Sequence, residues 1–274
     1  MASSPPELLR DQRRKEGDTV LWAGAFPLLL FLLLPLVALT FKQAPAAWLA
    51  RLATPMARHA LVLSLETTAV ATVLAVVFGL PLAYLLARVP FRGRDLIDVL
   101  VDLPVVVPPV VAGVGLLLVF GRQGFLGSPL ASLGLRIAFT RAAVILAQLL
   151  VAAPLFVHAA RAAFTAVDPG LERAAQVHGA SRLRAFLTVT LPLARPALVA
   201  GAVLAWARAL SEFGATLIFA GNFPGRTQTL PLAVMSALES DLDTAVAIAT
   251  LSLAVGVTAL LAARLAGHRR TGAG

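Results

Sequence analysis

Residues 171–180 read LERAAQVHGA, a charged stretch with an alanine pair and a glycine, in a chain whose other segments are strongly apolar. The 274 residues are 59% apolar and only 14% charged, whereas about 25% of the residues in soluble domains are charged. The composition therefore predicts an all-α polytopic membrane protein, and it places 171–180 in a loop between two spans.

Six apolar runs are long enough to cross the roughly 30 Å hydrocarbon core as helices. The predicted spans are 20–41, 60–87, 99–120, 142–160, 197–221 and 244–265. The first run exceeds the core of about 7–15 residues of a secretory signal, so we expect an uncleaved span after a tail, 1–19, and a second tail over 266–274. Pro104, Pro108 and Pro109 interrupt the third run, which predicts either a kinked helix or a broken helix beside a transport pathway.

The distribution of basic residues predicts the orientation of these spans. If the N-terminal tail is cytosolic, 15 of the 23 Lys and Arg residues fall in inner segments, seven in outer segments, and Arg208 within a span. An excess of basic residues is typical of cytoplasmic loops, so both termini and the loop 161–196 are predicted to be cytosolic. The same bias explains the net charge of +9 without a nucleic-acid partner.

Several functional classes lack their sequence signatures here. The chain has only two lysines, Lys15 and Lys42, and no G-x-x-x-x-G-K-[ST] loop for binding ATP. H-E-x-x-H and G-x-S-x-G are also absent, there is no cysteine, and the four histidines are scattered. We therefore expect no enzyme activity, no catalytic residue, no metal site and no cofactor held by this chain itself.

Local signals predict a helical elbow within the loop 161–196. Asp168 followed by Pro169 is typical of a helix start, and Gly179 suits the left-handed conformation that ends a helix. Ser181 would cap a second segment that we expect to end at Pro192. The first helix either docks into a groove of another protein, where its alanines allow close approach, or lies on the membrane as an ordinary amphipathic helix.

The elbow resembles the "EAA" loop of ABC importer permeases. The resemblance is carried by Glu172, Ala174, Ala175, Gly179, Val189, Leu191 and Pro192. This chain departs from the family pattern by placing Arg173 before the alanine pair and by having Val189 where isoleucine is usual. The resemblance implies that this loop is the coupling helix, which docks into a separate cytosolic ATPase subunit.

Two further stretches narrow the family. DLPVVVPPVVAGVGLLLVFGRQG (102–124) and WARALSEFGATLIFAGNFPGRTQTLPLAV (206–234) resemble permeases for molybdate and tungstate, with sulfate or thiosulfate permeases as the nearest rival. The resemblance implies a type I ABC importer permease fold, alternating access, an ATPase dimer that uses ATP and Mg, and an external oxyanion-binding protein. It also implies a bacterial inner membrane or an archaeal plasma membrane.

Other features of the chain bear on its assembly. No internal repeat is evident, and six spans alone enclose little of a route, so we expect two copies with the route at their interface. The missing repeat also weakens the alternative of an ATP-independent secondary transporter. A channel is the other ATP-independent alternative.

Four charged residues fall within the predicted spans, where burying a charge in the hydrocarbon region costs free energy. They are Glu66, Asp102, Arg208 and Glu212. Arg208 and Glu212 are four residues apart and can pair on one helix face. The pair is either structural, or Arg208 faces the route and attracts an anion weakly. We predict a gate lining formed by Arg208, Glu212, Phe213, Gly214, Pro108 and Pro109.

Overall fold

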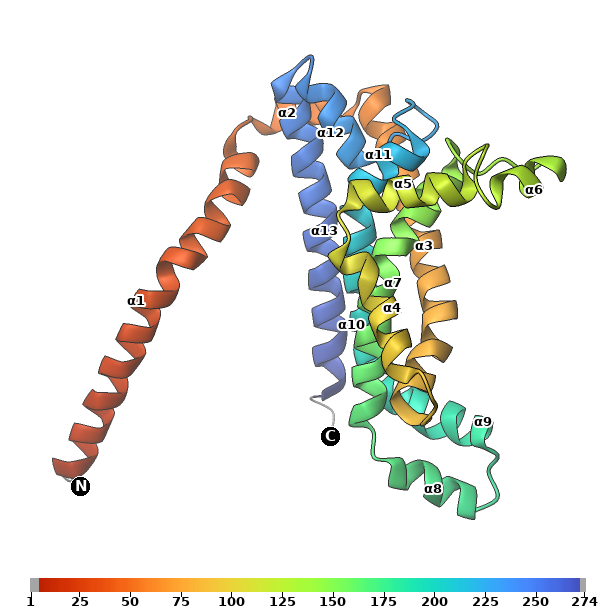
Figure 1. Ribbon diagram of the computed structural model, residues 1–274. Coiled ribbons are helices and arrows are strands. Elements are labelled where there is room, and N and C mark those ends of the chain that lie inside the picture. Colours follow the sequence, from red (N-terminus) through yellow and green to blue (C-terminus); the bar gives the residue numbers. More distant parts are fainter. Residues whose placement is uncertain (1–4, 272–274) are drawn as a thin grey trace. The chain divides into compact units, whose positions relative to one another are not determined.

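The computed structural model describes residues 5–271, with the side chains of residues 21–263, and all regular elements of that part are helices (Figure 1). The ends of the two predicted tails, 1–4 and 272–274, lie outside the described residues. The helices are α1 (Pro5–Phe41), α2 (Pro45–Leu52), α3 (Pro55–Arg88), α4 (Arg94–Val106), α5 (Pro109–Phe120), α6 (Gly127–Ser132), α7 (Arg141–Ala166), α8 (Pro169–Val177), α9 (Arg182–Ala185), the π-turn η1 (Phe186–Thr190), α10 (Leu191–Leu210), α11 (Gly214–Ala220), α12 (Leu230–Leu238) and α13 (Leu242–Thr271).

The chain divides into two compact units, Met1–Leu49 and Ala50–Gly274. In the first unit, α1 begins at Pro5, so the helix runs through most of the predicted tail 1–19 as well as the predicted first span. The apolar side chains between Leu21 and Phe41 are exposed. A helix that is apolar all round and not covered by protein is suited to contact with lipid.

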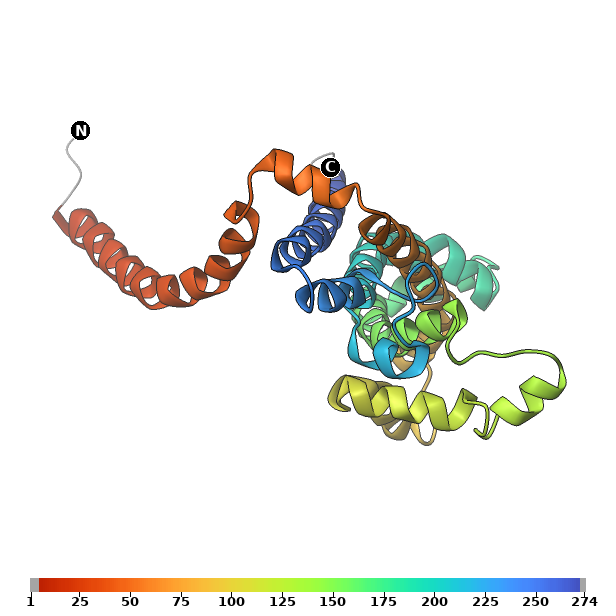
Figure 2. The same ribbon diagram turned by 90° about the horizontal axis from the view of Figure 1, so that it is seen from above.

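In the second unit, α3, α7 and α10 pack side by side along their lengths (Figures 1 and 2). Small residues permit this close approach: a Cβ added to Gly79 would lie 2.9 Å from Phe156 Cδ1, and one added to Gly201 would lie 2.5 Å from the Cβ of Ala159. Small residues at helix contacts are typical of membrane bundles, where close packing replaces the hydrophobic effect as the source of association.

The third predicted span is a broken helix. It consists of α4 and α5, which are bent by 114° at a break next to Pro108 and Pro109, and α5 runs across one end of the bundle (Figure 1). Proline lacks the N–H that continues a helix, and it disfavours the helical conformation at the preceding residue. Two consecutive prolines therefore separate two helices here rather than kink one.

The fifth predicted span, 197–221, does not coincide with one helix. One helical segment runs from Arg182 through α9, η1 and α10 to Leu210, and α11 is a separate short helix after a break at 211–213. The predicted end at Pro192 is wrong. The N–H of Leu191 bonds to the Phe186 carbonyl oxygen, five residues back; this widened turn accommodates the proline, which has no N–H to donate.

Five helices of the described chain are long and apolar enough to cross a membrane, and the bent α4–α5 pair would be a sixth. The helices α3, α7 and α13 extend beyond the predicted spans 60–87, 142–160 and 244–265. Hydropathy marks the apolar centre of each span, whereas the helix continues into polar residues for as long as its backbone hydrogen bonds are satisfied.

Candidate functional site

The elbow predicted between the fourth and fifth spans is present as α8 and α9. The carboxylate of Asp168 accepts a 2.7 Å hydrogen bond from the Gly170 N–H, and Pro169 occupies the first turn of α8. Gly179 has φ +88°, a left-handed conformation that suits glycine. Ser181 Oγ accepts a hydrogen bond from the Arg184 N–H and starts α9. The local capping signals therefore place both helices correctly.

The carboxylate of Glu172 points towards the bundle of its own chain. The hydroxyl of Tyr84 donates to Glu172 Oε2 at 3.2 Å, and the hydroxyl of Thr190 donates to Glu172 Oε1. Arg88 Nε lies 3.6 Å from Oε1, with only 11% and 12% of the Arg88 and Glu172 side chains exposed. Glu172 therefore joins α8 to the end of α3 and to η1, a role that the alanine-pair pattern by itself does not indicate.

Two further contacts fix the end of α3 against the elbow. Arg88 also donates a 2.5 Å hydrogen bond to the carbonyl oxygen of Val167, the residue that ends α7. The rings of Tyr84, Phe164 and Phe186 pack edge to face with centroid separations of 4.7–5.7 Å. Aromatic pairs in this geometry stabilise by about 0.5–1.5 kcal/mol beyond the area that they bury, so α3, α7 and η1 form a common support for α8.

The opposite face of α8 is apolar and exposed. Leu171, Ala174 and Val177 recur every three residues, and Leu171 and Val177 are 47% and 86% exposed. Of these three residues, the family resemblance marks only Ala174, although the helical spacing of Leu171 and Val177 within a charged loop is a usable signal. Ala175 is half-buried on the inner side. We call Leu171, Ala174 and Val177 the outer face of α8.

Leu191 and Pro192, the last two residues of the "EAA" resemblance, lie at the start of α10. Leu191 packs against the main core cluster, whereas Pro192 is exposed. Both residues therefore shape the turn that joins α9 to α10, and neither belongs to the outer face of α8.

The pair of charges at the end of α10 forms as its spacing predicts. Arg208 Nη2 lies 3.2 Å from Glu212 Oε2, with 33% of the Arg208 side chain and 1% of the Glu212 side chain exposed. Glu212 Oε1 also accepts a 2.8 Å hydrogen bond from the Ala215 N–H in the first turn of α11. Glu212 thus neutralises Arg208 and satisfies a backbone donor that a helix start otherwise leaves without a partner.

The predicted gate residues from the two broken segments meet in space. A Cβ on Gly214 would lie 2.8 Å from the Cβ of Pro109, so the start of α11 lies directly against the start of α5. Further along the same contact, a Cβ on Gly113 would lie 2.8 Å from the Cβ of Ile218. Phe213, which precedes α11, is partly exposed. The structure therefore joins the proline break to the Arg208–Glu212 pair through backbone contacts.

The two other charged residues in the predicted spans also have partners. Glu66 Oε2 lies 3.3 Å from Arg141 Nη1, and Asp102 Oδ1 lies 2.6 Å from His158 Nε2. Their carboxyl-bearing side chains are about half exposed, so these pairs lie on the outside of the bundle and not at the junction of α5 and α11.

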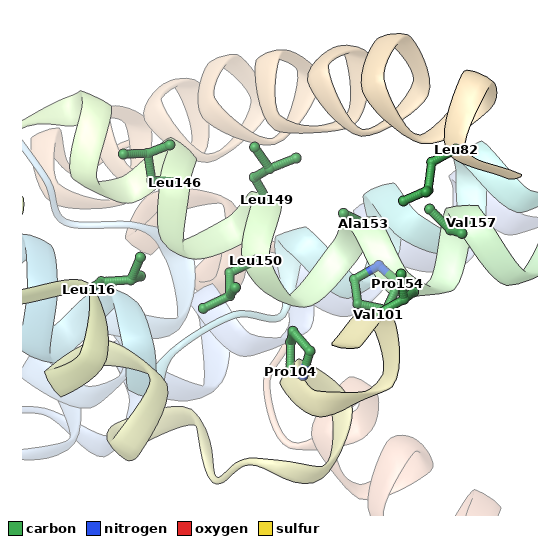
Figure 3. A pocket seen from close by; sticks show the side chains of 10 residues that line it. All are labelled: Leu82, Val101, Pro104, Leu116, Leu146, Leu149, Leu150, Ala153, Pro154 and Val157. Atoms are coloured by element: carbon green, nitrogen blue, oxygen red, sulfur yellow. The ribbon is translucent and has the colours of Figure 1, made fainter. Parts of the chain in front are cut away.

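An apolar cavity of 310 Å³ opens where the bend between α4 and α5 faces α3 and α7 (Figure 3). Its lining consists of Leu82, Val101, Pro104, Leu116, Leu146, Leu149, Leu150, Ala153, Pro154 and Val157. These side chains offer no hydrogen-bond donor. An oxyanion would lose its hydration there without replacement, so this cavity is not an anion site.

Comparison with known proteins places this architecture in a family. The family model described as "Binding-protein-dependent transport system inner membrane component" matches residues 75–271. The molybdenum transport system permease protein ModB of Mycobacterium tuberculosis is 42% identical over 234 residues, which are 85% of this chain and 88% of the relative. A probable molybdenum ABC transporter permease of Haloferax volcanii is 43% identical over 248 residues, 89% of this chain and 88% of the relative.

A solved structure supports the fold. A bacterial ABC transporter that imports the polysaccharide alginate superposes with a TM-score of 0.75 at 21% identity, covering 96% of this chain and 99% of that chain. The predicted all-α class and importer-permease fold are confirmed by this likeness. Together with the matched family model and the relatives above 40% identity, it shows that the chain belongs to the binding-protein-dependent transport system inner membrane components, the permease subunits of ABC importers.

Proposed function

We propose that this chain is the permease subunit through which an ATP-driven importer carries molybdate or tungstate into the cytoplasm. The observation that carries the proposal is the identity of 42–43%, over 85–89% of the chain, to permeases named for molybdenum transport. Two copies would enclose the route at their interface, with both termini in the cytoplasm of a bacterium or archaeon. A binding protein would deliver the oxyanion from outside.

The geometry supports two different roles for the two faces of α8, one in docking to the ATPase and one in contact with the bundle of its own chain. The outer face, with Leu171 and Val177 exposed, is apolar and suits a groove on the cytosolic ATPase dimer. On the inner side, Glu172 transfers any displacement of α8 to α3 and to Thr190 in η1. ATP and Mg would be used by the ATPase alone, and this chain would perform no bond chemistry.

The helical segment Arg182–Leu210 connects the elbow with the predicted gate. Its first end carries η1, which contacts Glu172, and its last turn carries Arg208, which pairs with Glu212 in the break before α11. This continuous helical segment of 29 residues would carry a displacement from the elbow to the gate. Closure of the ATPase dimer would thus reorient α11 against α5 and turn the route outward, and hydrolysis would return it inward.

The proposal is tested in proteoliposomes that contain this chain, its ATPase subunit and the cognate binding protein. We expect molybdate or tungstate to stimulate ATP hydrolysis and sulfate to leave it unchanged. Stimulation by sulfate alone would retain the importer and change its cargo. If no ATPase subunit copurifies with the chain, the importer mechanism is wrong and an ATP-independent transporter or channel becomes the better explanation.

A further inference from the structure

A second cavity has a volume of 480 Å³. The segments that form it lie at the end of the bundle opposite α8 (Figure 1). The cavity is formed by the segment that connects α5 with α7, including part of α6, together with Arg226 from the loop between α11 and α12. Three arginines line it, Arg122, Arg136 and Arg226, and no carboxylate does. The cavity thus gathers positive charge from segments about 90 residues apart in sequence.

These three arginines have exposed side chains, and within the part of the chain that the structure describes none of their guanidinium groups has an ion pair or hydrogen bond. Like charges that share one hollow repel each other, and this repulsion is relieved when carboxylates or other anions enter. The arginines therefore form a positive site whose complement is missing from the chain itself.

The wall of the cavity is held firmly against α11. Phe139, which lines it, has φ +61°, an uncommon conformation for a bulky residue, and its N–H bonds to the Phe219 carbonyl oxygen at 3.2 Å. The rings of Phe120 and Phe219 pack at 6.2 Å. A strained residue persists only where its surroundings hold it. The cavity is consequently a formed feature, and two of its lining residues, Phe120 and Phe139, are held in place by contacts with Phe219 of α11.

We propose that this cavity receives an acidic projection of the external binding protein, whose Asp or Glu carboxylates pair with Arg122, Arg136 and Arg226. The inference rests on the proposed function, because it requires a binding protein that docks on the side opposite α8. The family description itself names dependence on such a protein, and a related alginate transporter has been solved in complex with its periplasmic protein.

The size and lining of the cavity favour a protein segment over a free oxyanion. A water molecule occupies about 30 Å³, so 480 Å³ is many times larger than one tetrahedral anion needs. Apolar side chains such as Leu130 and Ile137 stand beside the arginines. A loop with carboxylates and apolar atoms matches this mixture, whereas a single hydrated anion would leave most of the wall without contact.

The test measures docking of the cognate binding protein to the complex of this chain with its ATPase subunit in nanodiscs. Exposed charge pairs contribute about 0.2–1 kcal/mol each, so Arg122→Gln, Arg136→Gln and Arg226→Gln should each weaken docking by about 1.4-fold to fivefold. The triple variant should weaken it about tenfold or more, mainly through slower association, and high salt should reduce the difference. Arg58→Gln removes the same charge from an exposed residue outside the cavity lining and should change docking less than twofold.

The possible outcomes separate this inference from the proposed function. If the wild type docks the binding protein and the triple variant docks equally well, the inference is wrong and the proposed function stands. Binding of radiolabelled molybdate to the permease is also measured without binding protein. If the triple variant loses this binding while docking is unchanged, the cavity is a free-anion site and the inference is wrong. If even the wild type fails to dock, the proposed function fails, and the inference with it. Retained assembly with the ATPase subunit shows that each variant is folded.

Discussion

At the scale of single residues, Glu172 has a position that its neighbours in sequence do not reveal. Its carboxylate accepts hydrogen bonds from Tyr84 and Thr190 and faces Arg88, all of them on other elements than α8. A charge that is nearly nine-tenths buried is stable only with such partners. Glu172 is therefore a positioning residue, which holds α8 against α3 and η1.

The pairing of Glu172 with Arg88 predicts non-additive substitutions. Glu172→Ala or Arg88→Ala each leaves one buried charge without its partner, whereas the double variant removes both charges. We expect a coupling energy of about 1 kcal/mol or more in a double-mutant cycle of thermal unfolding in detergent. Stimulation of the ATPase by binding protein should fall in both single variants. Additive effects on unfolding would show that the 3.6 Å contact contributes nothing.

Gly179 provides a second prediction at this scale. Proline is fixed near φ −65° and cannot adopt the +88° found here, and it would also lose the N–H that bonds to the Gln176 carbonyl oxygen. Gly179→Pro should therefore abolish ATPase coupling while the chain still inserts into the membrane. A Cβ at this position would meet no atom within 4 Å, so Gly179→Ala is the matched control: it costs about 1 kcal/mol in backbone strain and should retain most of the coupling.

At the scale of elements, α8 has two faces of different character, and the segment Arg182–Leu210 runs from the elbow to the predicted gate. The inner side of α8 makes polar contacts with its own chain, while the outer face leaves Leu171 and Val177 exposed. An apolar face on a charged surface loop is typical of a site where another protein binds. The π-turn η1 joins α8 to α10 structurally, because it contacts Glu172 and continues directly into α10.

Docking through the outer face predicts a large effect of one exposed residue. Val177 is 86% exposed, and full burial of a valine contributes about 1.5–3 kcal/mol. Val177→Asp should weaken association with the ATPase subunit at least tenfold, measured by copurification and by titration of the purified subunits. Leu133→Asp makes a comparable change at a residue that is 74% exposed near the opposite end of the bundle and should have no effect. Equal association of both variants would exclude α8 as the docking element.

Arg208 either forms a structural ion pair with Glu212 or attracts the transported anion, and paired substitutions distinguish these two roles. Arg208→Met leaves Glu212 buried without its ion pair, so the stability and abundance of the protein should decrease. Adding Glu212→Gln removes the unpaired charge while keeping an oxygen that can accept from the Ala215 N–H. If the pair is structural, the double variant regains stability and oxyanion uptake. Regained stability with uptake still low would instead show that Arg208 attracts the anion.

At the scale of the whole molecule, one chain presents surfaces that match three kinds of partner. The outer face of α8 lies at one end of the second unit, the arginine-lined cavity lies at the other end, and apolar helices surround the region between them. In the proposed importer, a second copy of this chain would pack against these apolar helices and complete the route.

A homodimer predicts the composition of the purified complex. Native mass spectrometry of this chain, expressed with its ATPase subunit, should give two copies of each protein, and loss of the ATPase by Val177→Asp should leave the permease pair intact. We expect this because the proposed contact between the two copies would use the apolar spanning helices and not α8. A one-to-one complex would contradict a route at the interface between two copies.

The sequence by itself determined the features that depend on composition and on contacts within a few residues. Apolar runs have to be helical in lipid because the backbone can satisfy its hydrogen bonds only internally, and the caps of α8 and α9 lie within three residues of the groups that they bind. The pairing of Arg208 with Glu212 follows from helical spacing in the same way.

Only the tertiary structure decided the features that join distant parts of the chain. The direction of the Glu172 side chain depends on Tyr84, 88 residues away, and the contact between Gly214 and Pro109 depends on how two short helices cross. Pro192 by itself predicted the end of a helix, but the helix continues through it because the turn before it is widened. Propensities and hydropathy describe local free energies, whereas these features arise from packing between elements, whose geometry is set when the whole bundle assembles.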